Sequence, residues 1–148
     1  MAPPRSTEQR IRHVRYRLRN DIDAWFATAS PHGVPHVIPL TFLWRRRRIF
    51  MATGENSVTV RNLSLRPQAR LALGHTRDVV LIDGWATLIP VGRLDPELRA
   101  AFAADTGWDA GGDEGYCFIE FEPEWIGAWR EENEVANRDV MRKGNWLA

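Results

Sequence analysis

The segment from Thr53 to Asn62 is the part of this sequence best suited to binding a ligand. Gly54 allows a tight exit from a strand, and Ser57 and Thr59 place hydroxyl groups at the start of a predicted helix. Arg61 adds a cation in the same turn. Amide groups at a helix N-terminus attract anions, and a guanidinium adds charge-assisted hydrogen bonds. The pattern therefore indicates a phosphate-binding site, with two simpler alternatives: Ser57 as a helix cap and Arg61 as a solvated surface residue.

Acid and base chemistry has a weaker basis in the sequence. Seven Asp and Glu residues lie between Asp113 and Glu132, and such carboxylates can serve as general acids and bases. However, Glu120, Glu122 and Glu124 alternate along a predicted strand, so they are expected to face water together. This pattern indicates a charged outer face.

Metal and nucleophile motifs are also missing. His32 and His36 are four residues apart, but Gly33 and Pro35 place them in a turn and a strand entry, and no third ligand accompanies them. No Gly-x-Ser-x-Gly elbow is present, and the single cysteine, Cys117, excludes a disulfide within the chain and any all-thiolate metal site. We therefore predict no catalytic side chain and no metal site.

The elements that must position the Thr53–Asn62 segment follow from periodicity and turn residues. Ser6 and Gln9 form a capping-box pattern, which predicts a basic amphipathic helix within residues 1–22. Strands are expected at residues 24–29, 34–44, 49–53, 69–74, 79–91 and 116–121, and short helices at 58–65 and 95–106. The last strand is expected to end at Pro123, before a polar tail that contains tryptophan. Six strands with few helices predict an α+β, mainly β, antiparallel barrel or sandwich.

Length and charge limit the remaining possibilities. With 148 residues the chain is the size of one ordinary domain, and its formal net charge of +1 gives no bulk argument for a polyanionic partner. Arginines cluster at 10–19 and 45–48, but on separate predicted elements and offset by acidic residues. We expect no nucleic-acid and no membrane partner. The start of the sequence lacks the apolar core of a signal peptide, so we expect a cytoplasmic protein.

Several ordered segments together resemble a known family. They are Trp25-Phe26-Ala27-Thr28, Gly33-x-Pro35-His36-Val37-x-Pro39-Leu40, Ile49-Phe50-Met51-Ala52-Thr53, Ser57-x-Thr59-x-Arg61-Asn62-Leu63, Arg66-Pro67-Gln68-Ala69-Arg70-Leu71-Ala72-Leu73 and Val80-x-x-x-Gly84-x-Ala86. The succession resembles the pyridoxamine 5′-phosphate oxidase-like FMN-binding split β-barrel proteins, also called flavin and deazaflavin oxidoreductases. The resemblance covers about residues 23–121. It implies a six-stranded antiparallel split β-barrel with short flanking helices, over residues 23–124. The tail, 125–148, lies outside the matched segments, and we expect it to pack on the barrel or the dimer partner.

The resemblance also implies an assembly and a cofactor. It implies a homodimer with one FMN or deazaflavin coenzyme F-420 in each of two clefts at the subunit interface. The strand Val37, Ile38, Pro39, Leu40 and Thr41 would run along the isoalloxazine ring, held largely by backbone groups. Thr53, Ser57, Thr59 and Arg61 would hold the phosphate, and Asn62 would either serve the phosphate or cap locally.

Departures from the family pattern narrow the expected activity. Family members often carry Arg or Lys at the positions of Ser57 or Val58 and of Thr59, so Arg61 is left as the principal cation. The glutamine that vitamin B6 oxidases have at the position of Val79 is absent, so we do not expect that activity. Trp129 or Trp146 could close over the cofactor from the partner subunit or cover the dimer interface, and we favour the interface role.

The resemblance thus predicts hydride transfer between a flavin-type cofactor and an unknown small organic substrate, with the chemistry supplied by the cofactor. The alternative is a non-catalytic split-barrel module that binds a cofactor or haem.

Overall fold

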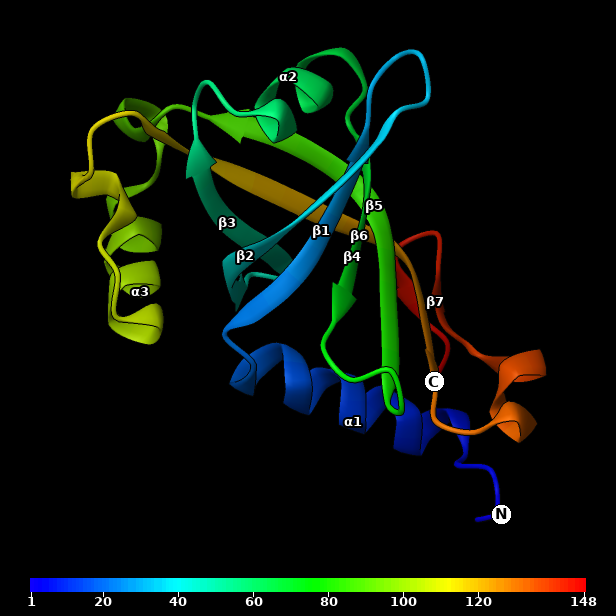
Figure 1. The fold of residues 1–148 in the computed structure, drawn as a ribbon. Coiled ribbons are helices and arrows are strands. Elements are labelled where there is room, and N and C mark those ends of the chain that lie inside the picture. The colour runs from blue at the N-terminus through cyan, green and yellow to red at the C-terminus, as the bar shows by residue number, and fades with distance from the viewer.

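A closed six-stranded antiparallel β-barrel forms the body of the molecule in the computed structural model, which describes residues 1–148 (Figure 1). Its strands follow the order β3-β2-β1-β4-β5-β6, and β3 pairs with β6 to close it. The bounds are β1 Asp23–Ala29, β2 Pro35–Arg45, β3 Arg48–Gly54, β4 Gln68–Leu73, β5 Val79–Ile89 and β6 Tyr116–Trp129. The predicted α+β split barrel is confirmed.

Three α-helices and a short C-terminal hairpin accompany the barrel. The helices are α1 Thr7–Asn20, α2 Val58–Leu65 and α3 Pro96–Thr106, and the hairpin strands are β7 Asp139–Arg142 and β8 Asn145–Trp146. Three 3₁₀ turns, η1 Val91–Arg93, η2 Ala110–Gly112 and η3 Glu132–Asn137, complete the chain. In Figure 1, α1 lies across one end of the barrel, α2 lies at the opposite end, and α3 stands to one side. No helix is long and apolar enough to cross a membrane.

Alternation along the strands explains which residues fill the barrel. On β1, Ala24, Phe26 and Thr28 are buried, whereas Trp25 points outward. Phe26 meets Phe121 of β6 edge-to-face, with ring centroids 5.4 Å apart. Helix α1 begins with the predicted capping box at Ser6. The helix buries its apolar face against the core and so closes one end of it.

Strand β6 extends past Pro123, where the sequence pattern predicts its end. The β5–β6 register changes between Asp83 and Gly84: Asp83 pairs with Trp125 and Gly84 with Pro123, so Glu124 is the extra residue of a bulge. Since a Cβ on Gly84 would collide with the Glu122 backbone, only glycine allows this close approach. The bulge accommodates Pro123 within the strand. Strand β6 therefore continues to Trp129, past residue 124, where the barrel was expected to end.

The barrel is split along β2. Residues 35–41 of β2 pair with β1 only, whereas Phe42 to Arg45 pair with β3. Beyond Met51, strand β3 pairs with β6 alone. The first half of β2 therefore has one backbone edge without a strand partner, next to the end of the barrel that carries α2.

Candidate functional site

Buried polar side chains gather where α2 meets the barrel. Only six polar or charged residues of the chain are buried, and four of them are Thr28 of β1, Thr53 at the end of β3, and Thr59 and Asn62 of α2. We call these four the neutral polar cluster. Helix α2 contacts β1, β3 and β5, and Asn62 Nδ2 donates a hydrogen bond of 3.0 Å to Thr28 Oγ1. Three of these four residues thus belong to the Thr53–Asn62 segment that was predicted to bind phosphate.

The two faces of α2 divide the predicted phosphate ligands. Ser57 is the N-cap, and its hydroxyl accepts a hydrogen bond of 3.2 Å from the Val60 amide. One turn further on the same face, Arg61 is exposed and forms no ion pair or hydrogen bond through its side chain. Thr59 and Asn62 lie on the buried face instead. Helix amides, Ser57 and Arg61 therefore share one solvent-facing end, and this set suits an anionic oxygen group.

Thr59 carries an unsatisfied hydroxyl. The residue has 0% exposure, and its Oγ1 has no hydrogen-bond partner in the protein. Leaving a buried hydroxyl unpaired costs roughly 1–3 kcal/mol. Asn62, for which the sequence left open a phosphate contact or a local cap, bonds Thr28 and so fastens α2 to β1.

Strand β2 presents its predicted ring-binding residues to two sides. Ile38 and Leu40 face inward and pack on the core, whereas Val37 and Pro39 are exposed. Thr41 is half-buried, and its hydroxyl donates to Asp23 Oδ1 over 2.9 Å. Side chains of Ile38 and Leu40 are thus committed to the core, and only their backbone groups are open to a ligand along the unpaired edge.

An exposed apolar face adjoins this edge, and the sequence patterns did not identify it. Trp25, Val37 and Trp85 are 50%, 57% and 44% exposed. A concavity of about 440 Å³ lies on the same side, lined by Trp85, Thr28 and the Arg70–Asp83 ion pair. That pair is bidentate, at 2.5 and 2.8 Å, and its hydrogen bond raises the pKa of Arg70. The alternation of exposed Trp25 with buried Phe26 was the available signal for this face.

Groups suited to bond-making chemistry are scarce near α2. Burial and the Glu55 carboxylate raise the pKa of Cys117, so its thiol stays protonated at neutral pH. No three His, Cys, Asp or Glu side chains are grouped to hold a metal ion. His32 is exposed in the β1–β2 turn, and His36 is half-buried on β2. The arrangement is suited to binding and orienting a ligand.

The two tryptophans of the tail contact their own chain. Arg15 of α1 lies over the Trp146 ring, 4.8 Å from its centroid, and Arg138 lies 5.8 Å from the Trp129 centroid. Trp146 also packs against the main core. These contacts fasten the tail to the end of the barrel that carries α1.

Known structures share this fold at low sequence identity. An FMN-binding protein from Nostoc punctiforme has a TM-score of 0.59 and 17% identity, over 91% of this chain and 89% of that one. An F-420 reductase has a TM-score of 0.60 and 15% identity, over 74% and 91%. A haem storage protein from Vibrio cholerae has a TM-score of 0.63 and 15% identity, over 90% and 97%. These likenesses establish the fold.

Sequence comparison identifies the family. A search of curated proteins gives no match. The sequence profile described as pyridoxamine 5′-phosphate oxidase matches residues 12–130, a range that contains the whole barrel, α2 and the neutral polar cluster. The chain therefore belongs to the pyridoxamine 5′-phosphate oxidase-like family of flavin-binding split barrels.

Proposed function

We propose that this protein is a flavin- or deazaflavin-dependent oxidoreductase that transfers a hydride between FMN or coenzyme F-420 and a small organic substrate. The observation that carries the proposal is the end of α2, where helix amides, Ser57 and the unpaired Arg61 share one solvent-facing end of a barrel whose strand β2 has an open edge. Family membership and structural neighbours that include an FMN-binding protein and an F-420 reductase support it.

The residues present fit such a cofactor. The N-terminal amides of α2 and the Arg61 guanidinium would hold its phosphate, and the backbone of Val37 to Thr41 would hold the ring. When bound, the cofactor supplies the hydride chemistry itself. The protein then needs only to orient the ring, and the apolar Val37 and Pro39 would exclude water from it.

We further propose that the functional unit is a homodimer. Trp25, Val37 and Trp85 place a large apolar area on one face, which a second copy of this chain would cover. The open edge of β2 borders that face, so a second copy would turn the exposed edge into a cleft between subunits. Sedimentation of the purified protein should give the mass of two chains.

Titration with each cofactor tests the proposal. FMN or F-420, followed by visible absorbance, should bind saturably, and the bound cofactor should be reduced and reoxidised by a substrate of the small organic class. Loss of a charge-assisted contact in Arg61→Ala should weaken binding by about tenfold or more. Arg77→Ala, an exposed arginine of the β4–β5 hairpin without an ion pair, should bind normally. Failure of both cofactors to bind at about 50 µM would contradict the proposal.

A second candidate is a binding module that holds a cofactor or haem without turnover. A haem storage protein that shares the fold favours it. A Soret absorbance band on haem titration, with no flavin binding, would support this candidate. Flavin binding without any hydride exchange would also support it.

A further inference from the structure

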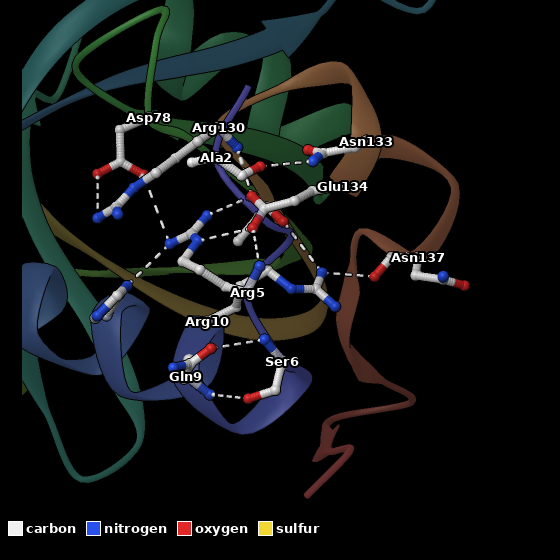
Figure 2. Close-up of polar contacts among 12 residues, drawn as sticks. Ala2, Arg5, Ser6, Gln9, Arg10, Asp78, Arg130, Asn133, Glu134 and Asn137 are labelled. Atoms are coloured by element: carbon white, nitrogen blue, oxygen red, sulfur yellow. Dashed lines mark hydrogen bonds and ion pairs between the residues drawn. The ribbon is translucent and has the colours of Figure 1, made fainter.

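Arg10 is a buried cation in the second cluster of polar residues, at the other end of the barrel from α2. It is 3% exposed and lies in the first turns of α1. Its Nη1 donates to the carbonyls of Ala128 and Asn137 at 3.2 and 2.5 Å, and its Nη2 donates to Thr7 Oγ1 at 3.3 Å. Figure 2 shows the guanidinium between the start of α1 and Asn137. All of these acceptors are neutral.

The positive charge of Arg10 is poorly compensated. Its guanidinium forms no ion pair, and its Nε has no hydrogen-bond partner in the protein. It also lies near the N-terminus of a 14-residue helix, where the helix dipole disfavours a cation. Burial lowers the pKa of Arg10, and the Glu134 carboxylate opposes that effect from a distance. A buried charge without a partner is costly, so this position favours an anion nearby.

A cavity of about 390 Å³ lies beside this guanidinium. Five charged side chains line it: Arg5, Arg10, Arg142, Glu134 and Asp139. Glu134 is held by Arg5 at 2.8 Å, and Asp139 is held by Arg142 at 2.8 Å, so each acid already has its own cation. Arg10 is left as the unmatched charge. The cavity therefore has an excess of one positive charge, increased by the amide end of α1.

We propose that this cavity binds a small organic carboxylate that carries a hydroxyl or amino group, whose negative charge compensates that of Arg10. A single carboxylate matches the single excess charge. Ser6, Thr7 and Asn133 supply neutral polar groups, and Asp139 supplies an acceptor for a hydroxyl or ammonium on the ligand. The site is independent of the proposed cofactor site and is formed by α1, η3 and β7.

L-lactate serves as the probe, added to the full-length ¹⁵N-labelled protein at constant ionic strength maintained with chloride. The Nε–Hε signal of Arg10 should shift saturably, with half-saturation at about 1–10 mM or below. Lactate should also raise the thermal midpoint. Arg10→Met should weaken binding at least tenfold. The Arg142 side chain is 63% exposed, so Arg142→Ala should fold normally. This variant should weaken binding severalfold, and it provides the test if Arg10→Met does not fold.

Two control variants test whether lactate binds in this cavity. Arg77→Ala removes an exposed arginine of the β4–β5 hairpin that does not line the cavity, and it should bind lactate normally. Arg61→Ala should also bind normally, which separates this site from the cofactor site. No saturable response, an equal response to chloride, or tenfold tighter binding of inorganic phosphate would each overturn the proposal.

Discussion

The two ends of the barrel bury polar groups of different kinds. Below α2, the neutral polar cluster contains hydroxyls and one amide, and one side-chain hydrogen bond within it joins Asn62 to Thr28. Beside α1, the buried groups are charged: Glu134 accepts from the Arg5 side chain, the Arg5 amide and the Arg130 amide (Figure 2). Neutral groups can remain incompletely bonded at a modest cost, whereas buried charges require partners.

The ion pair at the α1 end of the barrel holds distant parts of the chain together. The Arg5–Glu134 pair joins the start of the chain to η3, residues 129 positions apart in the sequence, and so holds the N-terminal segment and the tail against the barrel. Around α2 no ion pair is formed, and Arg61 is left open to solvent. The paired charges beside α1 therefore contribute to stability and leave only Arg10 for an anion, whereas α2 is left open to a ligand by the absence of ion pairs.

The largest expected effect is at the charged end. Glu134→Ala would leave Arg5 and two backbone amides without their acceptor in a mostly buried setting, so the free energy of unfolding should fall by roughly 3–5 kcal/mol. Denaturant unfolding at pH 7 measures this loss. Glu132→Ala, an exposed glutamate in the same turn, should change stability by less than about 0.5 kcal/mol. Equal effects of the two substitutions would show that the pair does not fasten the tail.

The same carboxylate should make stability depend on pH. Burial alone raises the pKa of Glu134, but hydrogen bonds from Arg5 and from the Arg5 and Arg130 amides outweigh it and lower the pKa to about 2, from an ordinary 4.5. The unfolded chain therefore takes up this proton first as the pH falls. About 3 kcal/mol of stability, present above pH 4.5, should be lost between pH 4.5 and 2.

To isolate the contribution of the Glu134 carboxylate, the unfolding free energies of the wild type and of Glu134→Gln are measured between pH 4.5 and 2. The difference between the two proteins should shrink as the pH falls toward 2. A difference that stays constant would mean that the carboxylate is not held as described.

The smallest effects distinguish two hydroxyls of the neutral polar cluster. Thr59→Val removes a buried hydroxyl that has no partner, so it should leave stability unchanged or raise it by up to about 1 kcal/mol. Thr28→Val removes the acceptor of Asn62 and should lower stability by about 1–2 kcal/mol. Thermal and denaturant unfolding compare the two variants. Destabilisation by Thr59→Val equal to that by Thr28→Val would mean that Thr59 has a bonding partner of its own.

Local sequence signals predicted most of the elements. Ser6 with Gln9 marks the start of α1, Ser57 caps α2, and Asp95 with Pro96 begins α3, because each cap depends on residues within one turn. Pro123 was misleading as a strand end because its place in β6 depends on a bulge opposite Gly84, in a strand about forty residues earlier. The tail strands β7 and β8 were not predicted, since they are only four and two residues long.

The orientation of the side chains in the candidate site was not predictable from the sequence. Proximity along the chain placed Ser57, Thr59 and Arg61 together, but helix geometry turned Thr59 inward and left Arg61 outward. The apolar face of Trp25 and Trp85 comes from β1 and β5, which pair with opposite edges of β4, so the alternation around Trp25 indicated only part of it.

The sequence by itself determined the barrel class and the helix caps, because these depend on residue type and short-range spacing. The tertiary structure decided which polar groups lack partners. Arg10 is one of many arginines in the sequence, and only its burial beside Ala128 and Asn137, more than a hundred residues away, makes it an uncompensated cation. Burial and long-range contact set the energy of a charge, and neither is contained in local sequence.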